Sequence, residues 1–448
     1  MIPRLPRRRP AAVVLPLSAA LALAVVGGTA DGASAHRGHT GPAGRVVSTA
    51  TLPDVPLAAF SNGLVRGSVT DDRGVDLGGI GSDLYPAGRR GEYWTVTDRG
   101  PNGQIAVGKD KRRTFPVPGF DPAIVKVRAT GGRLRVLEAV PITTAHGAPV
   151  TGLPNQPGRD EAPYTYDAST PLPYNPNGLD TEGIVRDRDG GFWLVDEYGP
   201  SLVHVSAKGR VLARHVPKGL NLTGTDYPVV ESLPAVFLQR KVNRGFEGLA
   251  LLPGGDLVLG LQSPLLNPDK AAGEESRTTR LLRFSPRENR VTAEYAYRFD
   301  PVGTVEPGQT KTSELKLSAL VALGGDRLLV QERTDKAARL YEVRLRRSDD
   351  ILGSPWDTAN APTLEQLDDR AAARVVLKKD LVIDLNTVKG VPGKIEGVAV
   401  EGSSTLVLLN DNDFGMTDGP GAFDARGRLV DSGVETTLVE VRLNRPVR

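Results

Sequence analysis

Glu182-Gly183-Ile184 is the segment that decides the fold, because near copies of it recur along the chain. The copies are Gly81-Ser82-Asp83-Leu84, Glu247-Gly248-Leu249, Glu396-Gly397-Val398 and the acid-free Leu317-Ser318-Ala319. Fifteen residues after each repeated acid, a second polar residue ends the next apolar run: Asp98, Glu197, Gln262 and Asp411, with Glu332 taken as its counterpart in the acid-free copy. Such a repeat predicts one supersecondary unit used several times, with each unit delivering polar groups to the same place.

Each repeat contains short apolar runs separated by Gly, Pro, Asn or Asp, which is typical of antiparallel strands. In the second unit the four runs are Glu182–Arg186, Gly191–Val195, Leu202–Val205 and Arg210–His215. The last unit ends one strand short, and Val46–Leu52 or Leu57–Phe60 can supply the missing strand. We therefore expect an all-β fold, a β-propeller of four-stranded antiparallel blades whose ring is closed by pairing of the N- and C-terminal strands.

Five blades can be counted directly. A sixth would require a degenerate copy within residues 53–79 or within the long fourth unit. A β-sandwich is the structural alternative, but a sandwich does not require a repeated internal signature. Helix is predicted only at Thr363–Ala373, where Thr363 and Gln366 have capping-box spacing.

The N-terminus has the pattern of an export signal. Arginines 4, 7, 8 and 9 precede an apolar run, residues 11–26, and Ala33-Ser34-Ala35 then provides small residues for cleavage near Ala35. A membrane anchor is the alternative, although the run is short and contains Pro16. We expect residues 1–35 to be a signal peptide, residues 36–45 to be a flexible tail and residues 46–448 to be a single propeller domain, secreted outside the cell.

Composition limits the partners. Removing residues 1–35 takes away four arginines and Asp31 and lowers the formal charge from +3 to zero, so the mature chain has no charge excess that favours nucleic acid or anionic membrane. Cysteine is absent, which excludes thiol catalysis and Cys-ligated zinc. No later segment has the length of a membrane span. We expect a monomer that acts on a small molecule.

The repeat also places the candidate site. In a four-stranded antiparallel blade, the start of the first strand and the end of the second lie side by side. This pairs Glu182 with Glu197, Asp83 with Asp98 and Glu396 with Asp411, and it gathers the acids at one mouth of the channel. Like charges that close are costly without protons, cations or arginines to compensate them. The structural alternative is that these acids bond backbone amides and hold the ring together.

The types of side chain favour a hard cation. The acid positions of the repeat contain no histidine, and oxygen-only clusters suit Ca²⁺ better than zinc or copper. The expected metal ligands are the repeated acids Glu182, Glu247, Glu396, Asp411 and Asp83. Arg99 and Arg333, which adjoin Asp98 and Glu332, can reach the channel mouth and bind phosphate oxygens bidentately. Tyr198 is expected to flank the site as a substrate-binding residue.

Five ordered strings carry a family resemblance: TDRGPNG at 97–103, DTEGIV at 180–185, DEYGP at 196–200, GFEGLALLPGGDLVLGLQSPL at 245–265, and KIEGVAVEG through NDNDFG within 394–415. The chain resembles the secreted phytase-like family, described as having "esterase-like activity of phytase". The resemblance implies a secreted β-propeller with phosphoesterase or esterase activity. Phe120-Asp121-Pro122-Ala123 matches only a fragment of the paired-aspartate motif of β-propeller phytases, so the substrate stays open.

The leading hypothesis is a Ca²⁺-dependent phosphoric-ester hydrolase. Asp98 or Glu197 would act as general base, and Arg99 and Arg333 would stabilise the phosphoryl charge. Carboxyl-ester or lactone hydrolysis at the same ring is one alternative. A non-catalytic propeller that binds a ligand or wall component, with one structural Ca²⁺, is the other.

Overall fold

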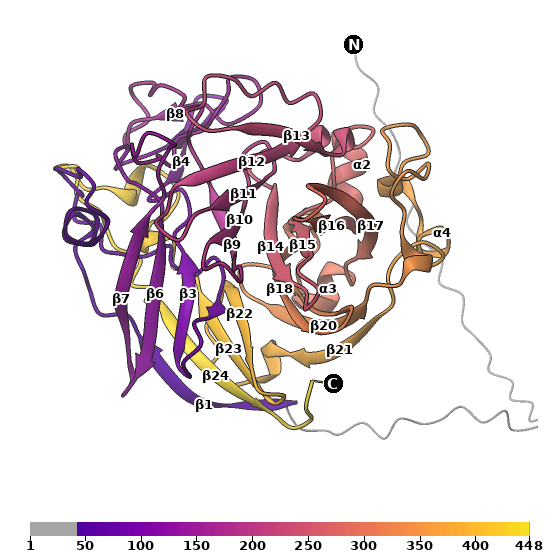
Figure 1. Cartoon of the computed structure of the whole chain (residues 1–448). Helices are drawn as coiled ribbons and strands as arrows, with labels where there is room; N and C mark the ends of the chain where they lie inside the picture. Colours follow the sequence, from indigo (N-terminus) through magenta and orange to yellow (C-terminus); the bar gives the residue numbers. More distant parts are fainter. Residues whose placement is uncertain (1–42, 448) are drawn as a thin grey trace, which may run out of the picture. The chain divides into compact units, whose positions relative to one another are not determined.

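Nearly all of the regular structure is β, and the strands form sheets of eight, five, four, four and three strands (Figure 1). The computed structural model describes residues 43–447. The predicted signal peptide and residues 36–42 of the predicted tail lie outside the described residues. No helix within 43–447 combines the length and apolar character that a membrane crossing requires.

The third and fourth repeat units form separate four-stranded antiparallel sheets, as the sequence predicts. The third contains β14 (Phe246–Leu251), β15 (Leu257–Leu261), β16 (Thr278–Ser285) and β17 (Arg290–Arg298), paired in chain order. The fourth contains β18 (Lys316–Gly324), β19 (Arg327–Arg333), β20 (Ala338–Arg344) and β21 (Lys379–Asp384).

The second unit gains a strand beyond the predicted four. Its sheet contains β9 (Thr181–Arg186), β10 (Phe192–Asp196), β11 (Ser201–Val205) and β12 (Val211–Pro217), and β13 (Val229–Leu233) then adds in parallel to β12. After residues 218–228 the chain returns to the edge of this sheet, where β13 pairs with β12.

The eight-stranded sheet consists of two four-stranded halves joined by a single parallel residue pair, Thr51 with Arg133. One half contains β2 (Tyr85–Pro86), β3 (Glu92–Val96), β6 (Ala123–Thr130) and β7 (Arg133–Pro141). The other contains β22 (Ile395–Glu401), β23 (Thr405–Asn410), β24 (Thr437–Leu443) and β1 (Gly44–Thr51). β1 pairs antiparallel with β24, so the N-terminal strand completes the sheet of the last unit (Figure 1).

Two sequence expectations are corrected in this region. β1 begins at Gly44, two residues inside the predicted tail, because Gly44 and Arg45 already pair with β24. Leu57–Phe60, the alternative for the missing strand, forms helix α1 and buries Leu57 and Phe60.

In the second and third repeats, the glycine after the acid allows the first strands of neighbouring sheets to touch. A Cβ built on Gly183 would lie 2.8 Å from the carbonyl oxygen of Glu247, and one on Gly248 would lie 2.5 Å from that of Ser318. At these distances only glycine fits without displacement of the backbone. β9 therefore packs against β14 and β14 against β18, and β18 also contacts β22 while β3 contacts β9.

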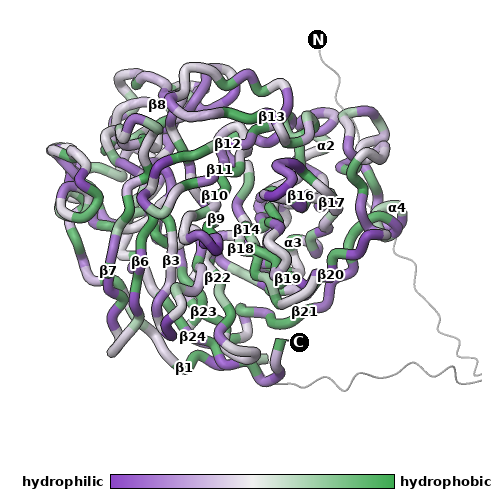
Figure 2. Tube along the Cα trace, viewed as in Figure 1, coloured by the Kyte–Doolittle hydropathy of each residue, from purple (hydrophilic) through white to green (hydrophobic). Residues whose placement is uncertain are grey.

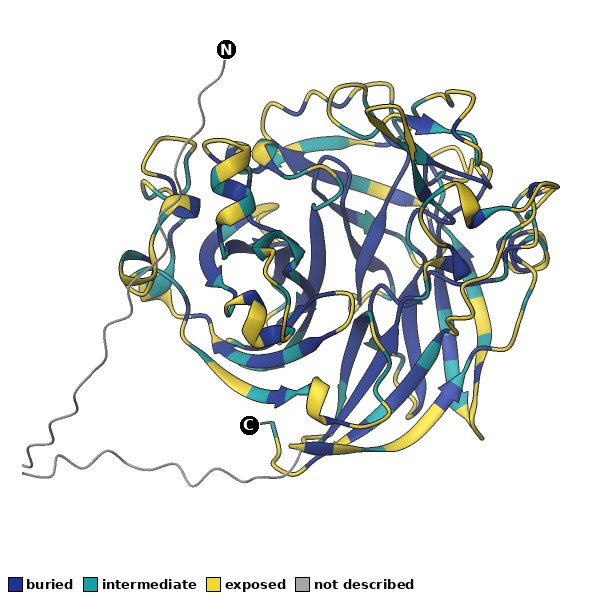
Figure 3. Ribbon diagram, turned by 180° about the vertical axis from the view of Figure 1, so that it is seen from behind, coloured by how far each residue is buried: buried dark blue, intermediate teal, exposed yellow. Residues whose placement is uncertain are grey.

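The core lies within and between the sheets. Figure 2 shows hydrophobic residues concentrated along the strands, and Figure 3 shows the strands largely buried with the exposed residues mainly in their connections. Four of the hydrophobic clusters draw their members from neighbouring sheets; one example packs Val195 and Trp193 of β10 with Leu249 of β14 and Phe284 of β16. This packing holds the strand ends in fixed positions.

The remaining elements are short. β4 (Gly103–Val107), β5 (Asp110–Thr114) and β8 (Pro163–Tyr164) form the three-stranded sheet. The helical segments are α1, η1 (Ser61–Val65), η2 (Ala235–Gln239), α2 (Lys270–Glu275), α3 (Val302–Val305), η3 (Thr312–Glu314), η4 (Arg347–Asp349), η5 (Leu364–Gln366), α4 (Asp369–Ala372), η6 (Leu385–Thr387), η7 (Asp413–Gly415) and η8 (Pro420–Ala422). The predicted capping box of Thr363 and Gln366 is present, but the predicted helix divides into η5 and α4 because Asp368 caps a new helix start.

Candidate functional site

One cavity of about 390 Å³ gathers most of the acids that the repeat predicts. Within the described residues, its lining includes ten carboxylate side chains and six cationic ones. The carboxylates are Asp98, Asp180, Glu182, Glu197, Glu247, Asp335, Glu396, Asp411, Asp413 and Asp418, and the cations are Arg99, Arg113, Arg244, Lys316, Arg333 and Lys394. The excess of four formal negative charges requires bound protons or cations.

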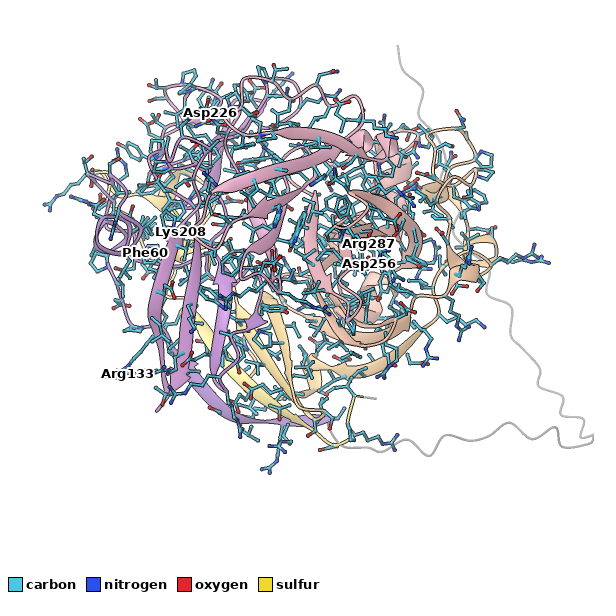
Figure 4. The ribbon with its side chains drawn as sticks, in the orientation of Figure 1. Phe60, Arg133, Lys208, Asp226, Asp256 and Arg287 are labelled. Carbon is cyan, nitrogen blue, oxygen red and sulfur yellow. The ribbon has the colours of Figure 1, made fainter. Side chains whose placement is uncertain are left out.

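The cavity lies where first strands begin and second strands end. Glu247 is the second residue of β14, and Gln262 directly follows β15. The turn between β14 and β15, marked by Asp256 in Figure 4, lies at the opposite end of these strands, with Arg287 of the β16–β17 turn labelled beside it. The acid cluster therefore belongs to one end of the sheets only.

Strand register corrects the assignment in the fourth unit. Leu317 pairs with Glu332 as Phe246 pairs with Leu261, so the residue equivalent to Gln262 is Arg333. Glu332 is one residue earlier and therefore faces the other side of the strand. Its carboxylate accepts hydrogen bonds from the Tyr297 hydroxyl and the Asp300 amide, away from the cavity lining.

Register also shifts the first unit by one residue. Trp94 pairs with Tyr85 as Trp193 pairs with Val185, so Asp83 occupies the glycine position of the repeat and Ser82 the acid position. Asp83 accepts hydrogen bonds from the backbone amides of Ile184 (2.9 Å) and Leu84 (2.8 Å) and is absent from the cavity lining. Burial raises the pKa of Asp83 to about 8. Its carboxyl group thus joins two neighbouring sheets.

Arg333 compensates the negative charge of two acids in the cavity. Its guanidinium donates to Glu247 (3.0 Å) and to Glu396, and its Nε donates to Ser318, the acid-free position of the repeat. Burial and the neighbouring Asp411 and Glu247 raise the pKa of Glu396 to about 7, against the opposing effect of Arg333 and Lys394. The loss of the acid at position 318 is thus matched by a cation from the same sheet.

Lys394 compensates the acids of the last unit. Its ammonium donates to Asp411 (2.6 Å) and to Asp413. Burial alone would raise the pKa of Asp411, but the charge and hydrogen bond of Lys394 hold it below its ordinary value. Asp411 is therefore an ionised partner of a lysine.

Three other carboxylates of the cavity have few cationic partners. Asp180, Glu182 and Glu197 each present an oxygen within 4.8 Å of the others. Arg99 lies 3.3 Å from Asp180, but within residues 43–447 no hydrogen bond or ion pair reaches the carboxylates of Glu182 and Glu197. This set, which we call the acidic trio, is the least neutralised part of the cavity.

Burial and like charges act together on these acids. Burial, followed by the charges of Glu247 and Asp180, raises the pKa of Glu182 well above its ordinary value. The pKa of Glu197 is raised in the same way, and burial raises that of Asp180 to about 6 although Arg99 opposes this. Burial and the charges of Asp411 and Asp180 also raise the pKa of Asp98, which accepts from the Gly100 amide. Each of these four acids thus has a raised pKa, which a bound cation would lower.

The acidic trio fits a hard cation. Its donors are carboxylate oxygens, its members are buried, and Glu197 and Gln262 of the same cavity each have a buried Oε1 without a hydrogen-bond partner in the described part of the chain. Such oxygen sets are the usual ligands of Ca²⁺. The acids predicted from the repeat thus divide into Glu182 in the trio, and Glu247, Glu396 and Asp411 with cationic partners.

Arg99 contacts the acidic trio through Asp180, and Tyr198 lies next to Arg99. Arg99 lines the cavity, pairs with Asp180 and Glu161, and donates to Asn102 at 3.0 Å. The Tyr198 ring lies 5.9 Å from the guanidinium of Arg99, and its hydroxyl donates to the Gly152 carbonyl at 2.8 Å, outside the cavity lining.

Several cavity residues were missed by sequence reasoning. Asp180 lies two residues before Glu182 and belongs to the predicted motifs only as the first residue of the DTEGIV string. Lys394 likewise stands two residues before Glu396. Arg244 lies in the connection before β14, and Lys316 is the first residue of β18. The repeated pattern of acids does not predict a cation at either position.

Comparison with known proteins adds a family to this geometry. The model of the phytase-like family, described as "Esterase-like activity of phytase", matches residues 75–414. The chain belongs to the phytase-like family. That match spans the acidic trio as well as Arg333 and Asp411.

A relative and two solved structures show the range of similarity. An uncharacterised secreted protein of Arthroderma benhamiae is 24% identical over 352 residues, which cover 66% of this chain and 67% of the relative. A PQQ-bound aldose sugar dehydrogenase from Streptomyces coelicolor has a TM-score of 0.34 at 12% identity, covering 84% of this chain and 98% of its own. Virginiamycin B lyase from Staphylococcus aureus has a TM-score of 0.28 at 10% identity, covering 79% and 99%.

Proposed function

We propose that this phytase-like protein is a secreted, Ca²⁺-dependent phosphoric-ester hydrolase whose site is the acidic cavity. The observation that carries the proposal is the acidic trio: Glu182 and Glu197 are buried beside Asp180, and within residues 43–447 no hydrogen bond or ion pair reaches their carboxylates. A purely structural acid cluster would be expected to carry its own compensation, as Glu247, Glu396 and Asp411 do. Family membership supports an ester as the substrate.

Asp180, Glu182 and Glu197 are the residues proposed to hold the ion. Bound there, Ca²⁺ would supply a Lewis acid for an ester oxygen and for a water molecule. The three carboxylates would fix the ion at one wall of the cavity, and their pKa values would fall when it binds because the cation favours their charged forms.

Asp98 is the proposed general base. It lines the same cavity, and only its Oδ1 accepts a hydrogen bond, from the Gly100 amide at 2.8 Å. Its raised pKa brings it closer to neutral pH, where a base transfers protons most effectively. Glu197, the other candidate from the sequence, is assigned to the trio.

Arg99 and Arg333 are proposed to balance the charge of the ring. Both line the cavity, and both already donate to carboxylates or lie in ion pairs with them. Their guanidinium groups keep Asp180, Glu247 and Glu396 in place while substrate enters. Asp83 and Tyr198 are given supporting roles, because each bonds backbone groups outside the cavity lining.

The finer architecture belongs to the same proposal. The contacts among first strands, together with the pairing of β1 and β24, support a closed ring of five blades formed by one domain over residues 46–448. The secreted relative from Arthroderma benhamiae supports export, with signal cleavage near Ala35. We propose that the mature protein is a monomer.

The test is hydrolysis of p-nitrophenyl phosphate, bis-p-nitrophenyl phosphate and p-nitrophenyl acetate by the mature chain, with Ca²⁺ and with EGTA. Phosphoester turnover that requires Ca²⁺ and is lost in Glu182→Gln is the expected result. Turnover of the acetate alone would assign the site to carboxyl esters or lactones. No turnover, with a melting temperature that still responds to Ca²⁺, would replace the enzyme by a binding propeller with a structural ion.

A further inference from the structure

Arg244 differs from the other cations of the cavity. Arg99, Arg113, Lys316, Arg333 and Lys394 each form an ion pair with a carboxylate. Arg244 forms no ion pair or hydrogen bond within residues 43–447, and its Nη1 is buried without a partner. A guanidinium nitrogen that is removed from water and left without an acceptor is costly, so its retention needs a reason.

The local backbone fixes Arg244 at the cavity. Asn243 has a positive φ of 54°. Gly245, two residues later, packs against the backbone of Glu197. A Cβ on Gly245 would lie 2.4 Å from the carbonyl oxygen of Glu197, so this close approach requires glycine. The segment 243–245 therefore holds Arg244 beside one member of the acidic trio.

Arg244 and Arg333 both repel Lys316 in this cavity. Lys316 and Arg333 pair with Asp335, which is mostly exposed. Burial, followed by the charges of Arg333 and Arg244, lowers the pKa of Lys316 to about 8, although Asp335 opposes this. An anion bound by Arg244 and Lys316 would reduce the repulsion between them.

We propose that Arg244, assisted by Lys316, is the oxyanion subsite of the cavity and binds the phosphate group of a phosphoester. This inference rests on the proposed function and adds its substrate-binding residue. The guanidinium offers two parallel donors to phosphate oxygens, and the ammonium adds a point charge. The acidic trio and Arg244 line the same cavity, and Arg244 adjoins the segment that packs against Glu197, so a phosphate bound by Arg244 lies next to the proposed ion site.

The experiment measures binding of inorganic phosphate to the full mature chain by titration calorimetry, without any turnover. Arg244→Gln should weaken phosphate binding about tenfold or more, the usual consequence of losing a charge-assisted bidentate contact. The matched control is Arg113→Gln, which also removes a cavity arginine but one already bonded to Glu161 at 3.0 and 3.1 Å. Arg113→Gln should change phosphate binding less than about twofold.

Two further measurements make the test decisive. Arg244→Lys keeps the charge but not the fork, and it should retain an intermediate affinity; thermal melting of each variant confirms that it is folded. Acetate should compete with phosphate only weakly. Equal phosphate binding by wild type and Arg244→Gln, equal losses in both arginine variants, or equal competition by acetate would each overturn the subsite. The hydrolase proposal has a separate failure, which is absence of Ca²⁺-dependent turnover in the wild type.

Discussion

Glu182 and Glu247 occupy equivalent positions in neighbouring repeats, yet replacing each by glutamine should have opposite effects on the calcium-free protein. Within residues 43–447 no hydrogen bond or ion pair reaches the carboxylate of Glu182, whereas Glu247 accepts from Arg333 at 3.0 Å. Glu182→Gln removes a repelling charge, and Glu247→Gln removes one of the three carboxylates that pair with a buried arginine. The two variants have the same chemistry and differ only in the charges around them.

The magnitude follows from the spacing in the acidic trio. Two ionised carboxylates with oxygens within 4.8 Å repel each other by about 3 kcal/mol at an effective dielectric constant of about 20. The raised pKa of Glu182 shows that protonation relieves part of this repulsion. We expect Glu182→Gln to stabilise the calcium-free protein by about 1–2 kcal/mol at pH 8. Glu247→Gln should destabilise it by about 1–3 kcal/mol, since Arg333 keeps Glu396.

Urea unfolding in EGTA and in saturating Ca²⁺ is the assay. Wild type should gain about 3 kcal/mol when Ca²⁺ is present at a hundred times its Kd. Glu182→Gln should lose most of that gain, so the order of stability of wild type and variant reverses on adding Ca²⁺. The reasoning is refuted if Glu182→Gln is less stable than wild type in EGTA, or if it keeps the full response to Ca²⁺.

Three further changes test the charge network and the core. Lys394→Met leaves the buried Asp411 without its partner and should cost about 2–4 kcal/mol in a thermal melt; an unchanged melting temperature contradicts the pairing. Arg214→Met should lower the stability by about 3–5 kcal/mol in the same thermal melt, because it leaves the fully buried Asp196, 2.6 Å away, without its ion-pair partner. A smaller loss of stability than for Lys394→Met would contradict this. Burial and His204 lower the pKa of His215 to about 4, below its unfolded value, so its contribution is present above about pH 6.5 and is lost as the pH falls through about 4. Urea midpoints of His215→Gln should therefore decline less steeply than wild type over that range, and parallel declines would exclude the effect.

The sequence predicts the strands well because their pattern depends on packing that repeats. Gly183 is needed for backbone contact with β14, and the adjoining acid then falls at the start of each first strand. The same local rule places the second polar residue at the end of the second strand. Fold and site were therefore predictable together from one short motif.

The errors arise where one residue changes the face of a strand. In the fourth unit, counting from Leu317 selects Glu332, but the strand register aligns Ser318 with Glu247 and therefore places Arg333 at the cavity position. A copy without the acid does not show where the count begins, and an offset of one residue changes the face because the side-chain period of a strand is two residues. Asp83 is offset by one residue in the same way, and its carboxylate accepts from the Ile184 amide.

Lys394 and Arg244, unlike Arg99 and Arg333, were not predicted because they reach the cavity from connections between strands. Lys394 has a positive φ of 47° just before β22, and Arg244 follows a left-handed Asn243. Neither position belongs to the repeated pattern, and each is specified by a contact between segments distant in the sequence. The division of the cavity into compensated and uncompensated walls thus appears only in three dimensions.

The most direct measurement of the central claim is one calcium titration followed both by calorimetry and by phosphoester hydrolysis, under the same conditions. If the ion held by Asp180, Glu182 and Glu197 serves the reaction, the Ca²⁺ concentration that gives half-maximal turnover equals the Kd for Ca²⁺. Both should shift together in Glu197→Gln. Hydrolysis that continues unchanged in EGTA while Ca²⁺ still binds to the trio would contradict the account.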